Sequence, residues 1–112
     1  MNRGEIWSAI WPNDPLEKLR PILIVSNNYR NSTLGLKDII VLKITSVSRT
    51  DGSLKYINRH EDMVIMLKKK SIIQAGAIFS IEKKYLRKFH LRLTYEQINE
   101  VDARLKTTLA LN

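Results

Sequence analysis

The chain has 112 residues, no cysteine, and 19 lysine and arginine residues against 11 acidic ones, for a formal net charge of +8. This length predicts one domain over residues 1–112, and the lack of cysteine excludes disulfide bonds, thiolate metal sites and cysteine nucleophiles. No apolar run approaches the roughly 20 residues of a membrane span, and residues 1–5 lack the apolar core of a secretion signal. We therefore expect a cytoplasmic protein whose basic balance favours an anionic partner: a nucleic acid, an acidic protein or an anionic membrane surface.

Short apolar runs rich in β-branched side chains follow one another along the chain and are typical of buried strands. Six strands are predicted, over residues 5–10, 21–25, 38–45, 63–67, 71–81 and 89–93. Turn-forming residues separate them: two prolines in 11–15, a polar cluster in 27–32 and an Asp-Gly pair in 48–53. Residues 82–88 fit one or two turns of helix.

The last segment carries the clearest helix signal. Thr94 followed by Gln97 fits a capping box, and apolar residues then recur at helical spacing to about Leu109. The strands are too closely spaced for helical crossovers between parallel strands. The sequence therefore predicts a mainly β (α+β) fold, a small antiparallel barrel or half-barrel with a C-terminal helix packed against it.

Basic residues concentrate between positions 68 and 92, where Glu82 is the only acid. The two histidines lie 30 positions apart, so an acid–base pair of histidines forms only if the fold joins them. His60 sits in a polar loop, which favours a solvated side chain. His90 alternates with Phe89 and Leu91, which predicts a side chain facing solvent from the last strand.

Arg20 opens a buried strand, and Pro21 restricts its backbone to extended conformations. A guanidinium fixed there suits a phosphodiester, because it is always charged and offers a planar fork of donors. Thr45 and Ser46 end the next strand and offer hydroxyls to the same phosphate. The alternative is that Arg20 pairs with Glu5 or Glu17 and that Thr45 merely ends a strand. The residues alone leave both interpretations open.

Four segments together resemble the MazF/PemK/Kid toxins in order and spacing: residues 3–7, 20–27, 40–46 and 98–105. The resemblance implies an SH3-like barrel with a C-terminal helix, usually a homodimer. It implies a metal-independent endoribonuclease without cofactor that cuts single-stranded mRNA. In that family the 2′-hydroxyl attacks the adjacent phosphorus and leaves a 2′,3′-cyclic phosphate and a 5′-hydroxyl. The implied partners are RNA and an acidic, partly disordered antitoxin, with no membrane.

The resemblance also assigns catalytic residues. Arg20 matches the arginine that precedes proline in the family, and Thr45 matches the threonine of its Thr-Ser or Thr-Ala pair. Arg20 would stabilise charge on the phosphate, and Thr45, together with Ser46, would hold a phosphate oxygen.

The chain departs from the family pattern after its fifth apolar run. Phe79 stands where some members have a catalytic arginine, and Glu82 falls where an aspartate usually follows. The first loop is shorter and lacks the usual Gly-rich, Glu-Gln segment. These changes predict different base recognition, in which Phe79 either stacks on a base or belongs to the core.

Further contacts to RNA are predicted from side chains near the implied groove, with plain solvation as the alternative for the loop cations: Asn28, Arg30, Arg49, Lys55 and Glu82. Two other functions stay open. One is a barrel that binds RNA without cleaving it or poisons gyrase in the manner of CcdB. The other is a degenerate toxin that only sequesters antitoxins.

Overall fold

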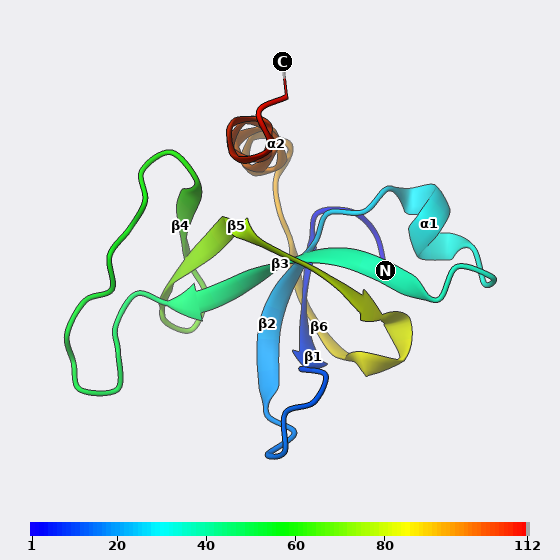
Figure 1. The fold of residues 1–112 in the computed structure, drawn as a ribbon, viewed down its shortest axis with the longest axis horizontal. Helices are drawn as coiled ribbons and strands as arrows, with labels where there is room; N and C mark the ends of the chain where they lie inside the picture. The colour runs from blue at the N-terminus through cyan, green and yellow to red at the C-terminus, as the bar shows by residue number, and fades with distance from the viewer. Residues whose placement is uncertain (112) are drawn as a thin grey trace.

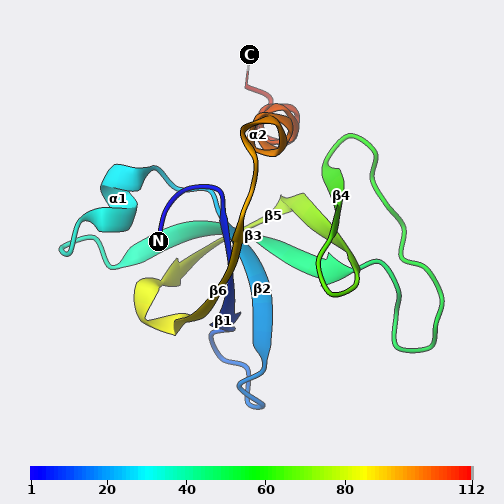
Figure 2. The same ribbon diagram turned by 180° about the vertical axis from the view of Figure 1, so that it is seen from behind.

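The computed structural model describes residues 1–111, which form one strongly twisted, curled antiparallel sheet and two α-helices (Figures 1 and 2). The six strands lie in the order β4-β5-β3-β2-β1-β6, so β4 and β6 are the edges. The expected antiparallel half-barrel with a C-terminal helix is confirmed. The elements are β1 (Glu5–Ile10), β2 (Leu19–Ile24), α1 (Asn28–Ser32), β3 (Asp38–Ser46), β4 (Asp62–Met66), β5 (Lys70–Glu82), the 3₁₀ turn η1 (Lys83–Tyr85), β6 (Leu86–Arg92) and α2 (Tyr95–Leu109).

All six predicted strands exist, but one predicted turn is a helix and one strand begins earlier than predicted. The polar segment 27–32 is the short helix α1 rather than a turn, because the Asn27 side chain accepts a hydrogen bond from the Arg30 amide and caps it. Residues 82–88 hold a single 3₁₀ turn, and β6 already begins at Leu86, three residues before the predicted start at 89.

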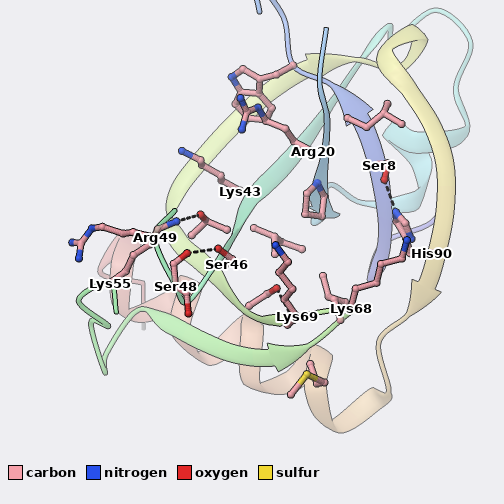
Figure 3. Close-up of a pocket in the computed structure, with 18 of the residues that line it drawn as sticks. Ser8, Arg20, Lys43, Ser46, Ser48, Arg49, Lys55, Lys68, Lys69 and His90 are labelled. Atoms are coloured by element: carbon pink, nitrogen blue, oxygen red, sulfur yellow. Dashed lines mark hydrogen bonds between the residues drawn. The ribbon is translucent and has the colours of Figure 1, made fainter. Parts of the chain in front are cut away.

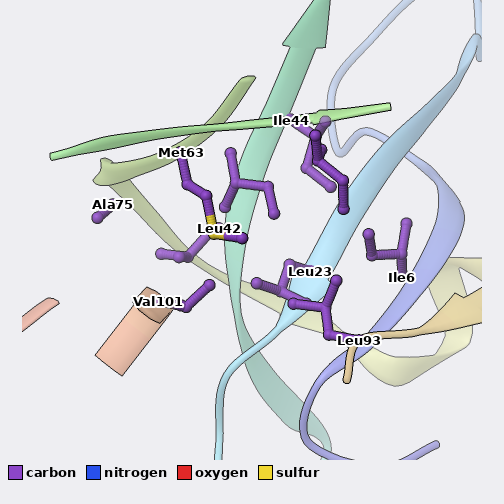
Figure 4. Close-up of a cluster of buried hydrophobic side chains, with 10 residues drawn as sticks. Ile6, Leu23, Leu42, Ile44, Met63, Ala75, Leu93 and Val101 are labelled. Atoms are coloured by element: carbon purple, nitrogen blue, oxygen red, sulfur yellow. The ribbon is translucent and has the colours of Figure 1, made fainter. Parts of the chain in front are cut away.

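Helix α2 begins and ends as predicted. Thr94 is its N-cap, and the reciprocal bonds of the capping box with Gln97 are both present. Its side chain Val101 packs into the sheet, which fixes the helix over the sheet face (Figure 4). Within residues 1–111, no helix has the length and apolar character to cross a membrane.

Alternating side chains bury both faces of the central strands. On β2, Leu23 faces the cluster beneath α2, whereas Ile22 and Ile24 face a second cluster. Each fully buried aliphatic side chain contributes about 1.5–3 kcal/mol relative to an exposed one. The cluster beneath α2 consists of Ile6, Leu23, Leu42, Ile44, Met63, Ile65, Ile73, Ala75, Leu93 and Val101 (Figure 4). The second consists of Ala9, Ile22, Ile24, Ile39, Val41 and Ile81, with Trp7, Trp11 and Leu86 at its margin.

Two irregular registers bend the sheet. Between β3 and β5, Leu42 pairs with Ile78 but the next residue, Lys43, pairs with Gln74, so residues 75–77 are extra on β5. The register between β1 and β6 shifts twice, once between residues 6 and 7 and once between residues 8 and 9. Such bulges increase the local twist and re-aim side chains, and the first shift on β1 lies beside the cavity described next.

Candidate active site

A cavity of about 1080 Å³ opens on the sheet and is lined by 20 of the described residues (Figure 3). None of these 20 residues is acidic. A cleft lined by charges of one sign concentrates field lines and attracts counter-ions, so this cavity is suited to a polyanion. Its lysine and arginine residues are Arg20, Lys43, Arg49, Lys55, Lys68 and Lys69.

The antiparallel register gathers these cations from distant parts of the chain. Arg20 lies at the start of β2 and Lys43 towards the end of β3, and Ile22 pairs directly with Lys43. Lys68 and Lys69 occupy the β4–β5 turn, which meets the end of β3 because Ser71 pairs with Ser46. Lys43 was not among the residues predicted for the site. Lys68 and Lys69 belong to the basic stretch between positions 68 and 92 and were likewise not predicted to contact RNA.

Arg20 projects a half-exposed side chain towards the cavity (Figure 3). Its Nη2 lies 3.4 Å from Oδ2 of Asp14, so the alternative in which Arg20 pairs with Glu5 or Glu17 is wrong. The proline-containing loop 11–18 folds back on β2 instead and brings Asp14 to the guanidinium. The hydrogen bond from the Leu16 amide and the charge of Arg20 lower the pKa of Asp14. One long ion pair leaves most donors of Arg20 free for an anion.

Thr45 and Ser46 both line the cavity, but their hydroxyls have different partners. The ammonium of Lys55 donates to Oγ1 of Thr45 at 2.5 Å, so the Thr45 hydroxyl proton stays available to a phosphate oxygen. Oγ of Ser46 donates to the carbonyl of Ser48 at 2.6 Å. Ser46 would have to break this bond to donate to RNA, which makes Thr45 the better placed hydroxyl.

Arg49 lines the cavity and also holds the shape of the β3–β4 loop. Its Nη1 donates to the carbonyl of Leu54 at 2.8 Å and to Oγ of Ser53 at 3.3 Å. These bonds close the Asp-Gly turn predicted from the sequence, and they leave the guanidinium at the cavity margin. The structure thus brings Arg49 and Lys55, both predicted to contact RNA, into one site with Arg20 and Thr45.

The structure does not bring three other predicted RNA contacts to this cavity. Asn28 and Arg30 belong to α1, which lies on the side of the sheet opposite β4 and the long β3–β4 loop (Figure 1). Oδ1 of Asn28 accepts a hydrogen bond from the Arg3 amide at 2.7 Å, and the carbonyl of Arg30 accepts one from Lys83 at 2.7 Å. Glu82, at the end of β5, pairs with Lys84 at 3.4 Å.

Phe79 is 40% exposed, so the expectation that it belongs to the core is wrong. Its ring packs edge-to-face on Trp11, with 4.8 Å between the ring centroids. Trp11 itself lines the cavity. Base stacking on Phe79 stays a prediction, now with an exposed ring that adjoins the cavity through Trp11.

His90 is exposed, as its alternation with Phe89 and Leu91 predicted, and it is also one of the residues that line the cavity. Its Nε2 is hydrogen-bonded to Oγ of the buried Ser8. His60 lies in the exposed turn before β4 and is not a lining residue, so the two histidines do not form a pair. Within residues 1–111, no group of three His, Asp or Glu side chains is arranged to hold a metal ion.

The curled antiparallel sheet, its C-terminal helix and the acid-free cationic cavity together describe a small half-barrel protein with a site suited to a polyanion. The chain belongs to the family of PemK-like, MazF-like toxins of type II toxin–antitoxin systems, whose model matches residues 2–109. A comparison with curated proteins gave no match.

Solved structures share this fold over nearly their whole length. An endoribonuclease from a mycobacterial species, in complex with its cognate antitoxin, is 22% identical, with a TM-score of 0.76, and the match covers 100% of this chain and 97% of that one. The Mycobacterium tuberculosis toxin MazF-mt6 is 17% identical, with a TM-score of 0.74 and coverage of 96% and 98%. A MazE–MazF complex from Deinococcus radiodurans is 15% identical, with a TM-score of 0.74 and coverage of 100% and 97%.

Proposed function

We propose that this toxin is an endoribonuclease that cuts single-stranded RNA in the cationic cavity. The observation that carries the proposal is the convergence of Arg20 and Thr45 in one cavity with five further cations and no acidic lining residue. Such a surface binds a phosphate backbone through counter-ion release. The mycobacterial structure with the same fold is an endoribonuclease, which supports the same class of reaction here.

In the proposed reaction, the 2′-hydroxyl of one ribose attacks the adjacent phosphorus and the bond to the 5′-oxygen of the next nucleotide breaks. Negative charge then builds up on the non-bridging phosphate oxygens. Arg20 donates to these oxygens, and the Thr45 hydroxyl, held by Lys55, donates to one of them. Donors fixed in advance where charge develops typically contribute about 10²- to 10³-fold in rate each.

The partner of the free toxin is proposed to be an acidic antitoxin segment that occupies the same cavity. An acid-free cationic cavity favours an acidic peptide for the same electrostatic reason that it favours RNA. The mycobacterial and Deinococcus structures contain toxin and antitoxin together, which supports this partner. Cytoplasmic location and assembly as a homodimer are proposed with it.

The test is cleavage of a mixed-sequence RNA by the purified protein in EDTA, followed by mapping of the ends. The expected products carry 2′,3′-cyclic phosphate and 5′-hydroxyl ends. Arg20→Ala is expected to lose at least about 10²-fold in rate. Arg87→Ala is the matched control, because Arg87 lies on β6 outside the cavity and donates only to nearby backbone carbonyls. Intact RNA, or an Arg20→Ala variant that cuts as fast as the control, would refute the proposal.

A non-cleaving binding module, on RNA or on gyrase, is the second candidate. Phe79 favours it, because an exposed aromatic ring stands where the family pattern has an arginine. This candidate predicts that the protein binds RNA, or gyrase, with an affinity that depends on salt. It also predicts that RNA incubated with the protein is recovered intact.

A further inference from the structure

We propose that His90 is the general base of this cleavage and that Ser8 is the residue that positions it. The inference rests on the proposed endoribonuclease function and supplies the proton acceptor that Arg20 and Thr45 do not provide. It follows from three features of the site: a bulge in β6, a buried serine on β1 and the composition of the cavity wall.

The bulge aims His90 into the cavity. Ile6 pairs with Leu91 and Trp7 pairs with Phe89, so His90 has no partner residue on β1. In a regular strand, His90 and Leu91 would point to opposite faces. Here both line the cavity, while Phe89 packs on Trp7 with 5.9 Å between the ring centroids. One extra residue has therefore turned the imidazole towards the cavity, a use of bulges that is common beside active sites.

Ser8 holds the imidazole on the same wall as Arg20. Oγ of Ser8 is buried and bonds to Nε2 of His90, as the dashed line in Figure 3 marks. Ser8 pairs with Pro21, and the next residue on β1, Ala9, pairs with Arg20. Strand β6 therefore lies two strands away from β2, about 10 Å across the sheet. His90 is level with residues 22–23 of β2, two to three residues along that strand from Arg20. Side chains reaching inwards from these two strands can meet one phosphodiester and its ribose.

The 20 lining residues include no other ordinary proton acceptor, and the carboxylate of Asp14, outside the lining, is paired with Arg20. Arg20 stays charged in proteins and has no acceptor atom, the lysines are ammonium donors, and none of the 20 lining residues is acidic. His90 is the one histidine among them, and imidazole is the side chain suited to proton transfer near neutral pH. The charged groups that share the cavity with it are Arg20 on β2, Lys43 on β3, Arg49 and Lys55 in the β3–β4 loop, and Lys68 and Lys69 in the β4–β5 turn.

His90 begins and ends the proposed step as a neutral imidazole. In the tautomer that the step uses, Nε2–H donates to Oγ of Ser8, and Nδ1 carries the lone pair that takes the proton of the ribose 2′-hydroxyl. The 2′-oxygen forms its bond to phosphorus as the bond to the 5′-oxygen breaks. The leaving oxygen keeps that electron pair and takes a proton from water, and the hydroxide so formed takes the proton back from the imidazolium. Ser8 holds the ring in the orientation that this step requires.

The experiment measures single-turnover cleavage of one mapped RNA site by the full chain between about pH 5 and 9. His90→Ala and His90→Gln are each expected to cleave about 10²- to 10⁴-fold more slowly than the parent. Neither variant is expected to show the rise of rate with pH that the parent shows. Both are expected to bind a 2′-deoxy analogue at the scissile position as tightly as the parent does. His60→Ala is the matched control and is expected to keep the parent rate, because His60 does not line the cavity.

Two further measurements separate the general base from other roles. Added imidazole is expected to restore part of the His90→Ala rate. A substrate with sulfur in place of the 5′-oxygen needs no proton on its leaving group, so the His90→Ala defect is expected to persist with it; recovery there would overturn the assignment as base. Ser8→Ala is expected to lower kcat with little change in KM and to shift the pH profile, and Ser8→Thr to restore both.

The outcomes distinguish this inference from the function on which it rests. Intact RNA with the parent protein would overturn both. Cleavage by the parent, together with rates and pH profiles of His90→Ala and His90→Gln that equal those of the parent, would overturn only the role of His90. The melting temperatures of the variants are expected to equal that of the parent, because the His90 side chain is exposed. A loss of rate at equal melting temperature is then a loss in the chemical step.

Discussion

Lys55 donates a hydrogen bond from Nζ to Oγ1 of Thr45 at 2.5 Å, so a residue of the long β3–β4 loop fixes the hydroxyl at the end of β3. The ammonium occupies one lone pair of that oxygen and leaves its proton free to donate. Lys55 thus orients the hydroxyl and also adds a positive charge beside the position proposed for a phosphate oxygen.

Replacing either member of this pair is expected to slow cleavage. Lys55→Met and Thr45→Val each remove one charge-assisted contact, worth about 10- to 100-fold in kcat/KM. The double variant is expected to lose little more kcat/KM than the less active of the two single variants, because both groups act on the same oxygen. A double-mutant cycle of kcat/KM measures this, and effects that simply multiply would show that the two residues act independently.

Lys68 and Lys69 in the β4–β5 turn are expected to contribute mainly through electrostatic attraction to the RNA backbone. The Lys68→Ala/Lys69→Ala double variant should bind a non-cleavable RNA more weakly, and the slope of log Kd against log salt should fall by about 0.7 for each phosphate that is no longer neutralised. The pair Lys84→Ala/Lys106→Ala carries the same charge change outside the cavity and serves as control. Equal slopes for the two double variants would contradict this prediction.

A side chain at Gly4 is expected to destabilise the fold. Its φ is +88°, and a Cβ there would lie 2.6 Å from Cδ1 of Ile98 on α2. Gly4→Ala is expected to destabilise the fold by about 1–3 kcal/mol through backbone strain and this clash. Urea unfolding measures the change. Gly35→Ala, where a Cβ meets nothing within 4 Å, is the control. Adding Ile98→Val, which removes Cδ1, should recover part of the loss.

Glu5 is expected to make stability depend on pH in the acid range. Burial opposes its charged form, but hydrogen bonds from Trp7 Nε1 and the Asn2 amide, with the charge of the amino terminus, lower its pKa below the ordinary value of 4.5. A lowered pKa in the folded state means that the charged group stabilises the fold above pH 4.5. This stabilisation is lost as the pH falls through the folded-state pKa.

The Glu5→Gln variant tests this sign. It should be less stable than the parent at pH 7, by on the order of 1 kcal/mol, and the difference should shrink as the pH is lowered through the folded-state pKa of Glu5. Unfolding midpoints in guanidinium chloride, measured from pH 7 downwards, give both quantities. A constant difference across this range would show that Glu5 acts through packing and not through its charge.

Much of this protein could be predicted from short stretches of sequence, because the signals there are local. A run of β-branched residues specifies a buried strand from its own side chains, and Thr94 with Gln97 specifies the start of α2 through bonds between residues three positions apart. Arg20 could be singled out for the same reason, since Pro21 restricts its backbone directly. The resemblance carried by these segments pointed to the family that residues 2–109 match.

The composition of the site was decided only by tertiary structure. Whether Lys43, Lys68 and Lys69 surround Arg20 depends on the pairing of strands far apart in the chain, and no local pattern fixes that register. The same holds for α1, whose position removes Asn28 and Arg30 from the cavity. The direction in which the His90 side chain points depends on a single extra residue in β6, opposite β1. Alternation along β6 predicted its exposure correctly, but only the bulge decides that the exposed imidazole meets Ser8 and faces the cations.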